Sequence, residues 1–537
     1  MHTLLQQPAL PLSHLDGPPI HEADELGFRD LPASGPNLAQ KYYEERLNRL
    51  ELSNWTSVAI ADDFAASVLS NYLELNHPVL GLFDAGLFLR DLTNLQHDFC
   101  STFLVNATLA FACQSFTGID LRAAPLASAF IREAERLWRS EGLLDSALNV
   151  ASILMLSVSI HTYGGDLKVT DLLDGGRCMA QRLGMFGPQL RSPSGVGSGE
   201  MSAEHQRSMA HIAHGAYAWL SLCTFYYPQN PTHLPPLWPA TGPDSFGNSA
   251  SEPLGIPARA TELAAIVDSK FTALCQFWSI MQVVATTYFA SRPKSKSVRE
   301  PIPLHFAEST YRKLLAWANT LEGTMSRENG GPEHVLVFHI LFHCAVIRIF
   351  IPFVNDSKEN RLLSFSSTDS SVKTVLHASI SQLKGLLLDC RQDRRKMLLI
   401  AHTNAAILHV SNAMLLDAAD RAGRGSPQDP DCRPYFLLCL ANCRDMYTCF
   451  PVFGSVGRGL LAMAMRDGVM DSESAKRLVA TLDSRGTHHD PTARRALGTF
   501  TIDFALAMRE PEHAEAATLA RQFDELTLFA DLTTGTW

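Results

Sequence analysis

Apolar residues recur at helical spacing along most of the chain. The pattern is clearest over residues 151–187, where two helices are predicted on either side of a polar turn. The first helix is apolar on nearly all sides and breaks at Gly164-Gly165; the second carries Leu172 and Met179 on one stripe. Gly184 follows that stripe, where a left-handed C-cap is favoured. A helix that is apolar all round must be buried, so this segment predicts a helical hairpin in the protein core.

The same periodicity predicts further helices on both sides of this hairpin. They are expected at residues 64–75, 83–92, 99–116, 124–141, 204–225, 258–288, 304–321, 333–354, 374–390, 397–419, 434–450 and 458–465. His77-Pro78 should end the first of them, because the residue before a proline avoids the helical conformation. No alternating segment is bounded by hairpin turns. The predicted class is all-α, a large irregular multi-helix domain of packed helical hairpins.

The domain organisation follows from where this periodicity begins. Residues 1–54 are expected to be a disordered tail with a short linker helix at 37–52, since the first part is rich in proline and glycine. Residues 55–537 are expected to form one helical domain. The proline-rich loop 227–257 is the candidate sub-boundary within it.

Composition narrows the class of protein. The chain has 537 residues with a formal net charge of −10, whereas a free-standing reader of duplex DNA normally carries a basic stripe. Its 11 cysteines are spread thinly, mostly through apolar helical segments, which indicates reduced core thiols in an intracellular protein. The N-terminus has neither a basic region nor an uninterrupted apolar one, so no signal peptide is predicted.

Residues 335–354 come nearest to a membrane span. The segment contains His339, His343, Arg348 and Pro352. An arginine in mid-bilayer costs at least about 2.5 kcal/mol. The segment is therefore predicted to be a buried helix of a soluble bundle, with no membrane partner.

Two groups of residues invite a metal-site interpretation. His339 and His343 are spaced i, i+4, but a metalloprotease needs a glutamate where the chain has Ile340. Satisfied core histidines are the favoured interpretation of this pair. A second group lacks the short Cys-x-x-Cys spacing of structural zinc sites and is better explained as buried thiols: Cys432, Cys439, Cys443 and Cys449.

The remaining motifs are weaker still. The glycine-rich run Gly454 to Gly459 has no phosphate-loop lysine and no preceding strand, so a turn opening a helix is favoured. Two short basic clusters are better explained as solvated surface than as localisation signals: Arg394-Arg395-Lys396, and Arg292 with Lys294 and Lys296. Because no nucleophile elbow or dinucleotide fingerprint is present, no catalytic, cofactor-binding or metal-binding residue is assigned, and the chain is not expected to be an enzyme.

Several segments taken in order resemble the regulatory (middle homology) domain of fungal binuclear zinc-cluster transcription factors. They run from residue 55 to about residue 355, with a weaker continuation to the end. The segments are Trp55-Thr56-Ser57-Val58 with Asp62-Asp63, His77-Pro78, Phe88 to Leu92, Phe99 to Ala110, Glu133-Ala134 with Leu137, the apolar helix from Ala151, Met179 to Gly184, Leu314 with Trp317, Phe342-His343, and Phe350-Ile351-Pro352-Phe353.

The chain departs from that family pattern in three places. The six-cysteine zinc cluster normally precedes the domain, but residues 1–54 contain no cysteine, so zinc-binding residues cannot be carried over. Phe350 and Ile351 stand where the family's closing turn usually has histidine and arginine. The stretch 227–243 stands where a Gly-Arg-Pro turn is common.

The resemblance implies a nuclear transcription regulator without its own zinc cluster, acting through other transcription factors or co-regulators, or else one whose zinc-cluster exon is missing from the gene model. It also implies a metabolic or secondary-metabolite gene cluster as the target, homodimers and a small-molecule effector in some members, and no direct DNA binding by this chain. The alternative is a helical small-molecule-binding protein or an enzyme with a pocket near His339 and His343, with Arg348 as a further candidate.

Overall fold

The computed structural model confirms the all-α class. It describes residues 42–140, 144–164, 169–187, 201–227, 235–236, 258–289, 302–321, 333–354, 361–365, 370–392, 400–423, 432–495, 497–507 and 509–534. Within these residues the regular elements are helices. The described extended pairing consists of two isolated bridges, Arg361 with Ser371 and Thr501 with Glu515.

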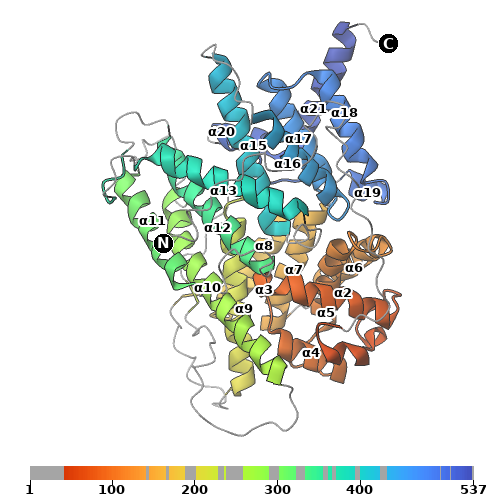
Figure 1. Cartoon of the computed structure of the whole chain (residues 1–537). Helices are drawn as coiled ribbons and strands as arrows, with labels where there is room; N and C mark the ends of the chain where they lie inside the picture. Colours follow the sequence, from red (N-terminus) through yellow and green to blue (C-terminus); the bar gives the residue numbers. More distant parts are fainter. Residues whose placement is uncertain are drawn as a thin grey trace.

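The N-terminal helices form one end of the molecule, the red to orange part of Figure 1. They are α2 (Asp62–Leu75), α3 (His77–Leu80), α4 (Ala85–Asn94), α5 (Thr102–Phe116) and α6 (Ala123–Trp138). Helix α5 packs against α2 and α6 and is buried on nearly all sides. Helix α2 ends just before His77-Pro78, as predicted, and the proline then lies in the first turn of the short α3.

The predicted core hairpin is confirmed. It consists of α7 (Ala147–Tyr163) and α8 (Val169–Arg182), which pack against each other, and α7 is buried from Val150 to Tyr163. Gly184 adopts a left-handed φ of +64°. The amide of Met185 then donates to the carbonyl of Ala180 at 2.9 Å, which closes the helix end as a Schellman motif.

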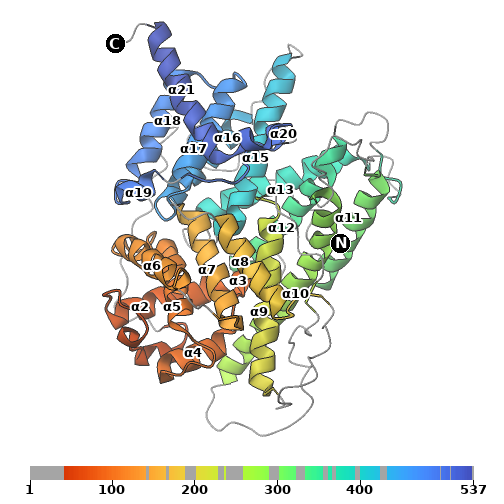
Figure 2. The ribbon, with the colours of Figure 1, turned by 180° about the vertical axis from the view of Figure 1, so that it is seen from behind.

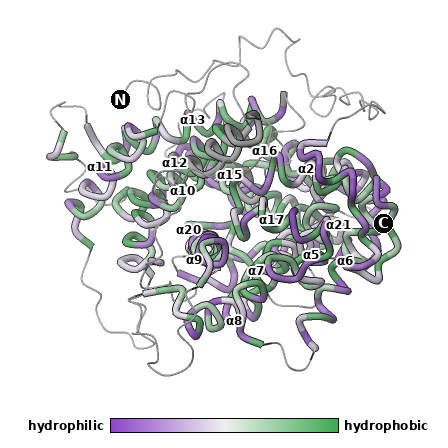
Figure 3. Tube along the Cα trace, turned by 90° about the horizontal axis from the view of Figure 1, so that it is seen from below, coloured by the Kyte–Doolittle hydropathy of each residue, from purple (hydrophilic) through white to green (hydrophobic). Residues whose placement is uncertain are grey.

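The middle of the chain forms a second group of long helices beside the hairpin. They are α9 (Ala203–Cys223), α10 (Ala258–Phe289), α11 (Leu304–Thr320), α12 (Glu333–Phe350) and α13 (Val372–Gln392). The window Val335–Phe353 is long and apolar enough to cross a membrane, and 83% of it is buried inside the protein, as in a core helix. Figure 3 shows hydrophobic and hydrophilic residues mixed along most of the helices, as amphipathic packing requires.

The C-terminal helices form the opposite end, blue in Figures 1 and 2. They are α15 (Ile400–Gly423), α16 (Cys432–Tyr447), α17 (Phe453–Arg466), α18 (Ser472–Ser484), α19 (Pro491–Arg494), α20 (Phe504–Ala507) and α21 (Ala516–Thr534). This end is tied to α7: the amide of Val452 donates to the carbonyl of Thr162 at 3.2 Å, and the Tyr163 hydroxyl donates to Asp490 at 2.8 Å. One apolar core therefore runs through both ends.

The expected linker helix differs from the structure. Its described part forms two short 3₁₀ turns, η2 (Glu45–Arg49) and η3 (Leu52–Asn54). Leu47 and Leu52 are buried in the core, so this segment packs onto the body as part of it. The predicted tail up to residue 41 and nearly all of the loop 227–257 lie outside the described residues.

Candidate functional site

The most unusual group in the interior is Arg348, in the last turn of α12. Its guanidinium carbon lies 4.5 Å from the ring centroid of Phe504 and 5.6 Å from that of Phe225. Phe225 follows the C-terminus of α9, and Phe504 begins α20. These contacts are cation–π interactions, worth about 0.5–2 kcal/mol each depending on exposure.

The backbone around Phe504 is held by polar contacts. Its amide donates to the Asn412 side-chain oxygen at 3.0 Å, and the Asn412 side-chain nitrogen donates to the carbonyl of Ile502 at 2.7 Å. Asp503 accepts from the amide of Leu506 at 2.9 Å and pairs with Arg466 at 2.7 Å. The backbone next to Phe504 is therefore fixed to both α15 and α17.

His409, on α15, completes this group. Its ring centroid lies 4.8 Å from that of Phe504, and the side chain is buried. Burial, together with the nearby charge of Arg348, lowers the pKa of His409 well below its ordinary value, so the imidazole is neutral at physiological pH. We call Arg348, His409, Phe225 and Phe504 the arginine centre.

The charge of the arginine centre is not balanced within the described part of the chain. There, no carboxylate or carbonyl oxygen pairs with or accepts a hydrogen bond from the Arg348 guanidinium, whose contacts are the two aromatic rings. Burial lowers the pKa of Arg348, but a guanidinium stays charged in proteins. The C-terminal end of the α12 dipole favours a cation by only about 0.3–1 kcal/mol, and the side chain is partly exposed, so solvent also hydrates the charge.

The two histidines singled out from the sequence do not join this centre. His339 and His343 are 3% and 1% exposed and lie in the packed interior around α12. His343 precedes Arg348 by five residues, so their side chains point about 140° apart around the helix. Within the described residues, no three His, Cys, Asp or Glu side chains come together in a way that could hold a metal ion.

The four clustered cysteines are buried free thiols in the structure. Burial raises the pKa of Cys439 to about 12 and that of Cys443 well above its ordinary value. Because a metal ligand must be a thiolate, both are poor ligands in this environment.

The glycine run does not form the expected turn. Gly454, Gly457 and Gly459 lie inside α17, which begins at Phe453. A Cβ on Gly457 would come within 2.7 Å of Leu482, and one on Gly454 within 2.9 Å of Tyr447, so these glycines permit close packing of α17 on its neighbours. The basic clusters at 292–296 and 394–396 lie outside the described residues.

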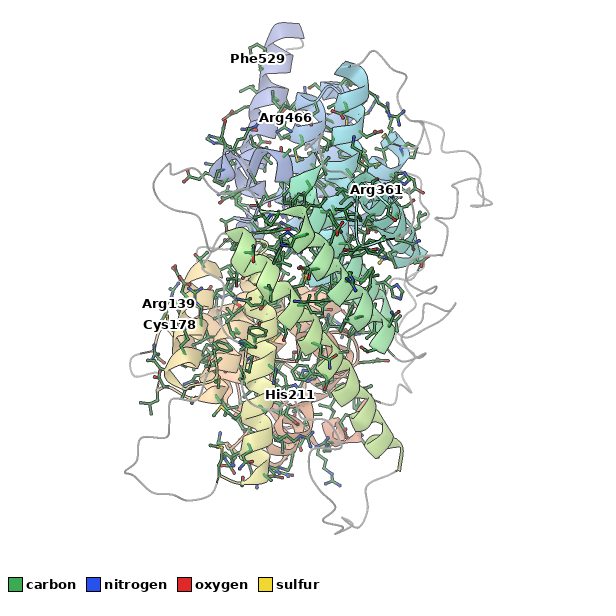
Figure 4. All side chains as sticks on the ribbon, turned by 90° about the vertical axis from the view of Figure 1, so that its left-hand side faces the viewer. Arg139, Cys178, His211, Arg361, Arg466 and Phe529 are labelled. Atoms are coloured by element: carbon green, nitrogen blue, oxygen red, sulfur yellow. The ribbon has the colours of Figure 1, made fainter. Side chains whose placement is uncertain are left out.

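A second buried basic group was not apparent from the sequence. The ring of His211, on α9, stacks on Phe271 at 4.2 Å and lies parallel to His77 at 6.3 Å. Burial lowers the pKa of His77 to about 3 and that of His211 to about 4. We call these three residues the histidine centre. Figure 4 labels His211 on α9 in the lower half and Arg466, which pairs with Asp503, in the upper half.

No sequence pattern identifies the residues that contact Arg348. His409 and Phe504 lie in two separate helices and Phe225 follows a third, and none of them stands out in its own segment. Arg348 itself stands out, because it is a charge in an apolar helix. The sequence therefore identifies the arginine as unusual but does not identify the residues that surround it.

Comparison with known proteins places the chain near fungal transcription regulators. It is 23% identical over 381 residues to the nitrogen assimilation transcription factor nirA of Emericella nidulans, an alignment that covers 67% of this chain and 42% of that protein. It is 24% identical over 370 residues to the notoamide biosynthesis transcriptional activator notL' of Aspergillus versicolor, covering 67% of this chain and 55% of that protein.

The chain thus spans about half the length of these curated relatives. No family model matches it, and no solved structure matches it. Both relatives are named for the control of transcription, which supports a transcription regulator over an enzyme.

Proposed function

We propose that these 537 residues form the regulatory region of a fungal zinc-cluster transcription regulator, acting in the nucleus on a metabolic or secondary-metabolite gene cluster. The observation that carries the proposal is the pair of relatives, one named for nitrogen assimilation and one for notoamide biosynthesis, each aligned with two-thirds of this chain. The all-helical architecture agrees with the resemblance seen in the sequence.

DNA contact is proposed to come from outside these residues. The sequence holds no six-cysteine cluster of paired short spacings, and its net charge of −10 disfavours a duplex-binding surface. The chain would then act through other transcription factors or co-regulators, as a monomer or as a homodimer.

A tethering assay tests this function. The full chain is fused to an unrelated DNA-binding module and expressed in a fungal host with a reporter downstream of that module's site. We expect reporter output to change severalfold, in either direction, relative to the module alone. A fluorescent fusion of the chain should accumulate in the nucleus.

Two results would contradict the proposal. One is a reporter that stays at the level of the module alone while the fusion is abundant and folded. The other is sequence-specific, salt-sensitive binding of duplex DNA by the purified chain without any fusion, which would place the DNA contact inside these residues.

A further inference from the structure

The arginine centre combines a permanent positive charge with a partly buried, largely aromatic environment. Arg348 is largely buried, with a minor part of its surface still accessible, and its described contacts are aromatic rings. Removing a partner from a buried ion pair costs several kcal/mol because the remaining charge is uncompensated. Arg348 has no carboxylate partner among the described residues, and its side chain is partly exposed, so a small molecule can reach the guanidinium.

The surrounding groups restrict what can compensate this charge. A guanidinium presents donors in a planar fork that matches a carboxylate in a bidentate geometry. His409 adds a neutral imidazole that can donate one further hydrogen bond. No second cation lies at the centre among the described groups that contact Arg348.

Charge balance and shape therefore favour a monoanion with an apolar body. One guanidinium neutralises one carboxylate, whereas a phosphate dianion would keep an uncompensated charge in the same apolar surroundings. Phe225 and Phe504 supply apolar surface beside the fork. Apolar surface beside a few polar groups is typical of small-molecule sites.

We propose that the arginine centre is a binding site for a small organic carboxylate, held by the Arg348 guanidinium with His409 as a second donor. The ligand joins α12 and α15 to the end of α9 and the start of α20, four elements far apart in the sequence. The site is inferred from geometry alone; its use as an input to transcription rests on the proposed function.

The test is thermal unfolding of the purified full chain in a buffer poor in small anions. Acetate and benzoate are the carboxylate probes, and inorganic phosphate and chloride are the comparison anions. We expect benzoate and acetate to raise the Tm saturably in the millimolar range, benzoate at the lower concentration. Arg348→Met should abolish this shift, and Arg348→Lys, which keeps the charge but loses the fork, should weaken binding by about tenfold.

Arg312, an exposed arginine on α11, provides the matched control, and Arg312→Met should respond like the wild type. If Arg348→Met does not fold, Arg348→Lys and His409→Phe carry the test, and both should shift the half-saturating concentration upward. The proposal is overturned if all variants respond equally, if phosphate alone gives a saturable shift, or if no carboxylate shifts the Tm. None of these results bears on the tethering assay, so the two proposals fail independently.

Discussion

The histidine centre and the arginine centre both place basic groups against aromatic rings but differ in how they carry charge, and a buried carboxylate, Asp84 paired with Arg207, lies near the histidine centre alone. At the histidine centre, burial lowers the pKa of His77 to about 3 and of His211 to about 4, so both rings are neutral near pH 7. At the arginine centre the guanidinium of Arg348 keeps its charge, and its described contacts are aromatic rings. A histidine can adapt to the interior by losing a proton, whereas an arginine stays charged and must be stabilised by solvent or by an anion.

The largest expected effect comes from breaking the helix crossing that encloses the histidine centre. Gly215 on α9 packs directly against the carbonyl oxygen of Gly81, so Gly215→Val must separate α9 from α3. We expect a loss of about 3 kcal/mol or more in the free energy of unfolding, measured by urea denaturation. Gly175→Ala in α8 is the control, because the added Cβ meets open space. This variant should raise the free energy of unfolding by roughly 0.5–1 kcal/mol.

A stable Gly215→Val protein would mean that the two helices do not need to touch there. The histidine centre would then not depend on this crossing for its burial.

Acidification should affect the histidine centre next most strongly. The pKa values of its two histidines lie below the ordinary 6.5, so the unfolded chain binds more protons between these values and stability falls as pH drops. From about pH 7 to about pH 5 each histidine should lower the free energy of unfolding by roughly 2 kcal/mol.

The measurement is urea denaturation at both pH values. The double variant His77→Gln with His211→Gln should lose roughly 2–4 kcal/mol less than the wild type over this interval. His305→Gln, at an exposed position on α11, should keep the wild-type dependence. Identical pH profiles for the wild type and the double variant would show that the two rings do not titrate as described.

A smaller effect is expected at the arginine centre, where Asn412 fixes the backbone beside Phe504. Asn412→Ala removes its hydrogen bonds to Ile502 and Phe504, at 2.7 and 3.0 Å, and should cost about 1–3 kcal/mol in urea denaturation. Asn412→Asp keeps the acceptor for the Phe504 amide but sets a carboxylate oxygen against the carbonyls of Leu408 and Ile502, so it should not restore the loss. An Asn412→Ala protein as stable as the wild type would mean that these hydrogen bonds do not stabilise the fold.

The helical framework was largely predictable because apolar periodicity reports burial directly. The hairpin of α7 and α8, the cap at Gly184 and the burial of α12 all follow from local pattern. The turn predicted at Gly454 to Gly459 was wrong, because a glycine run can also permit close packing of a helix on its neighbours. Only the contacts with Tyr447 and Leu482 distinguish the two cases.

The two centres were less predictable for a related reason. The spacing of His339 and His343 places them on one helix face, which a sequence reveals. The residues of the arginine centre come from four separate segments, which it does not. His77, His211 and Phe271 likewise come from three helices. Contacts between residues 60 or more positions apart, such as His211 and Phe271, leave no trace in local spacing.

The most direct test of the account is the stability of Arg348→Met in a buffer poor in small anions, measured by urea denaturation because urea adds no anion. We predict that the variant is at least as stable as the wild type, by about 0–2 kcal/mol, since methionine removes an uncompensated charge, and that benzoate then stabilises only the wild type. A variant that is less stable without anions, by a margin that benzoate leaves unchanged, would show that Arg348 is a packing residue and contradict the account.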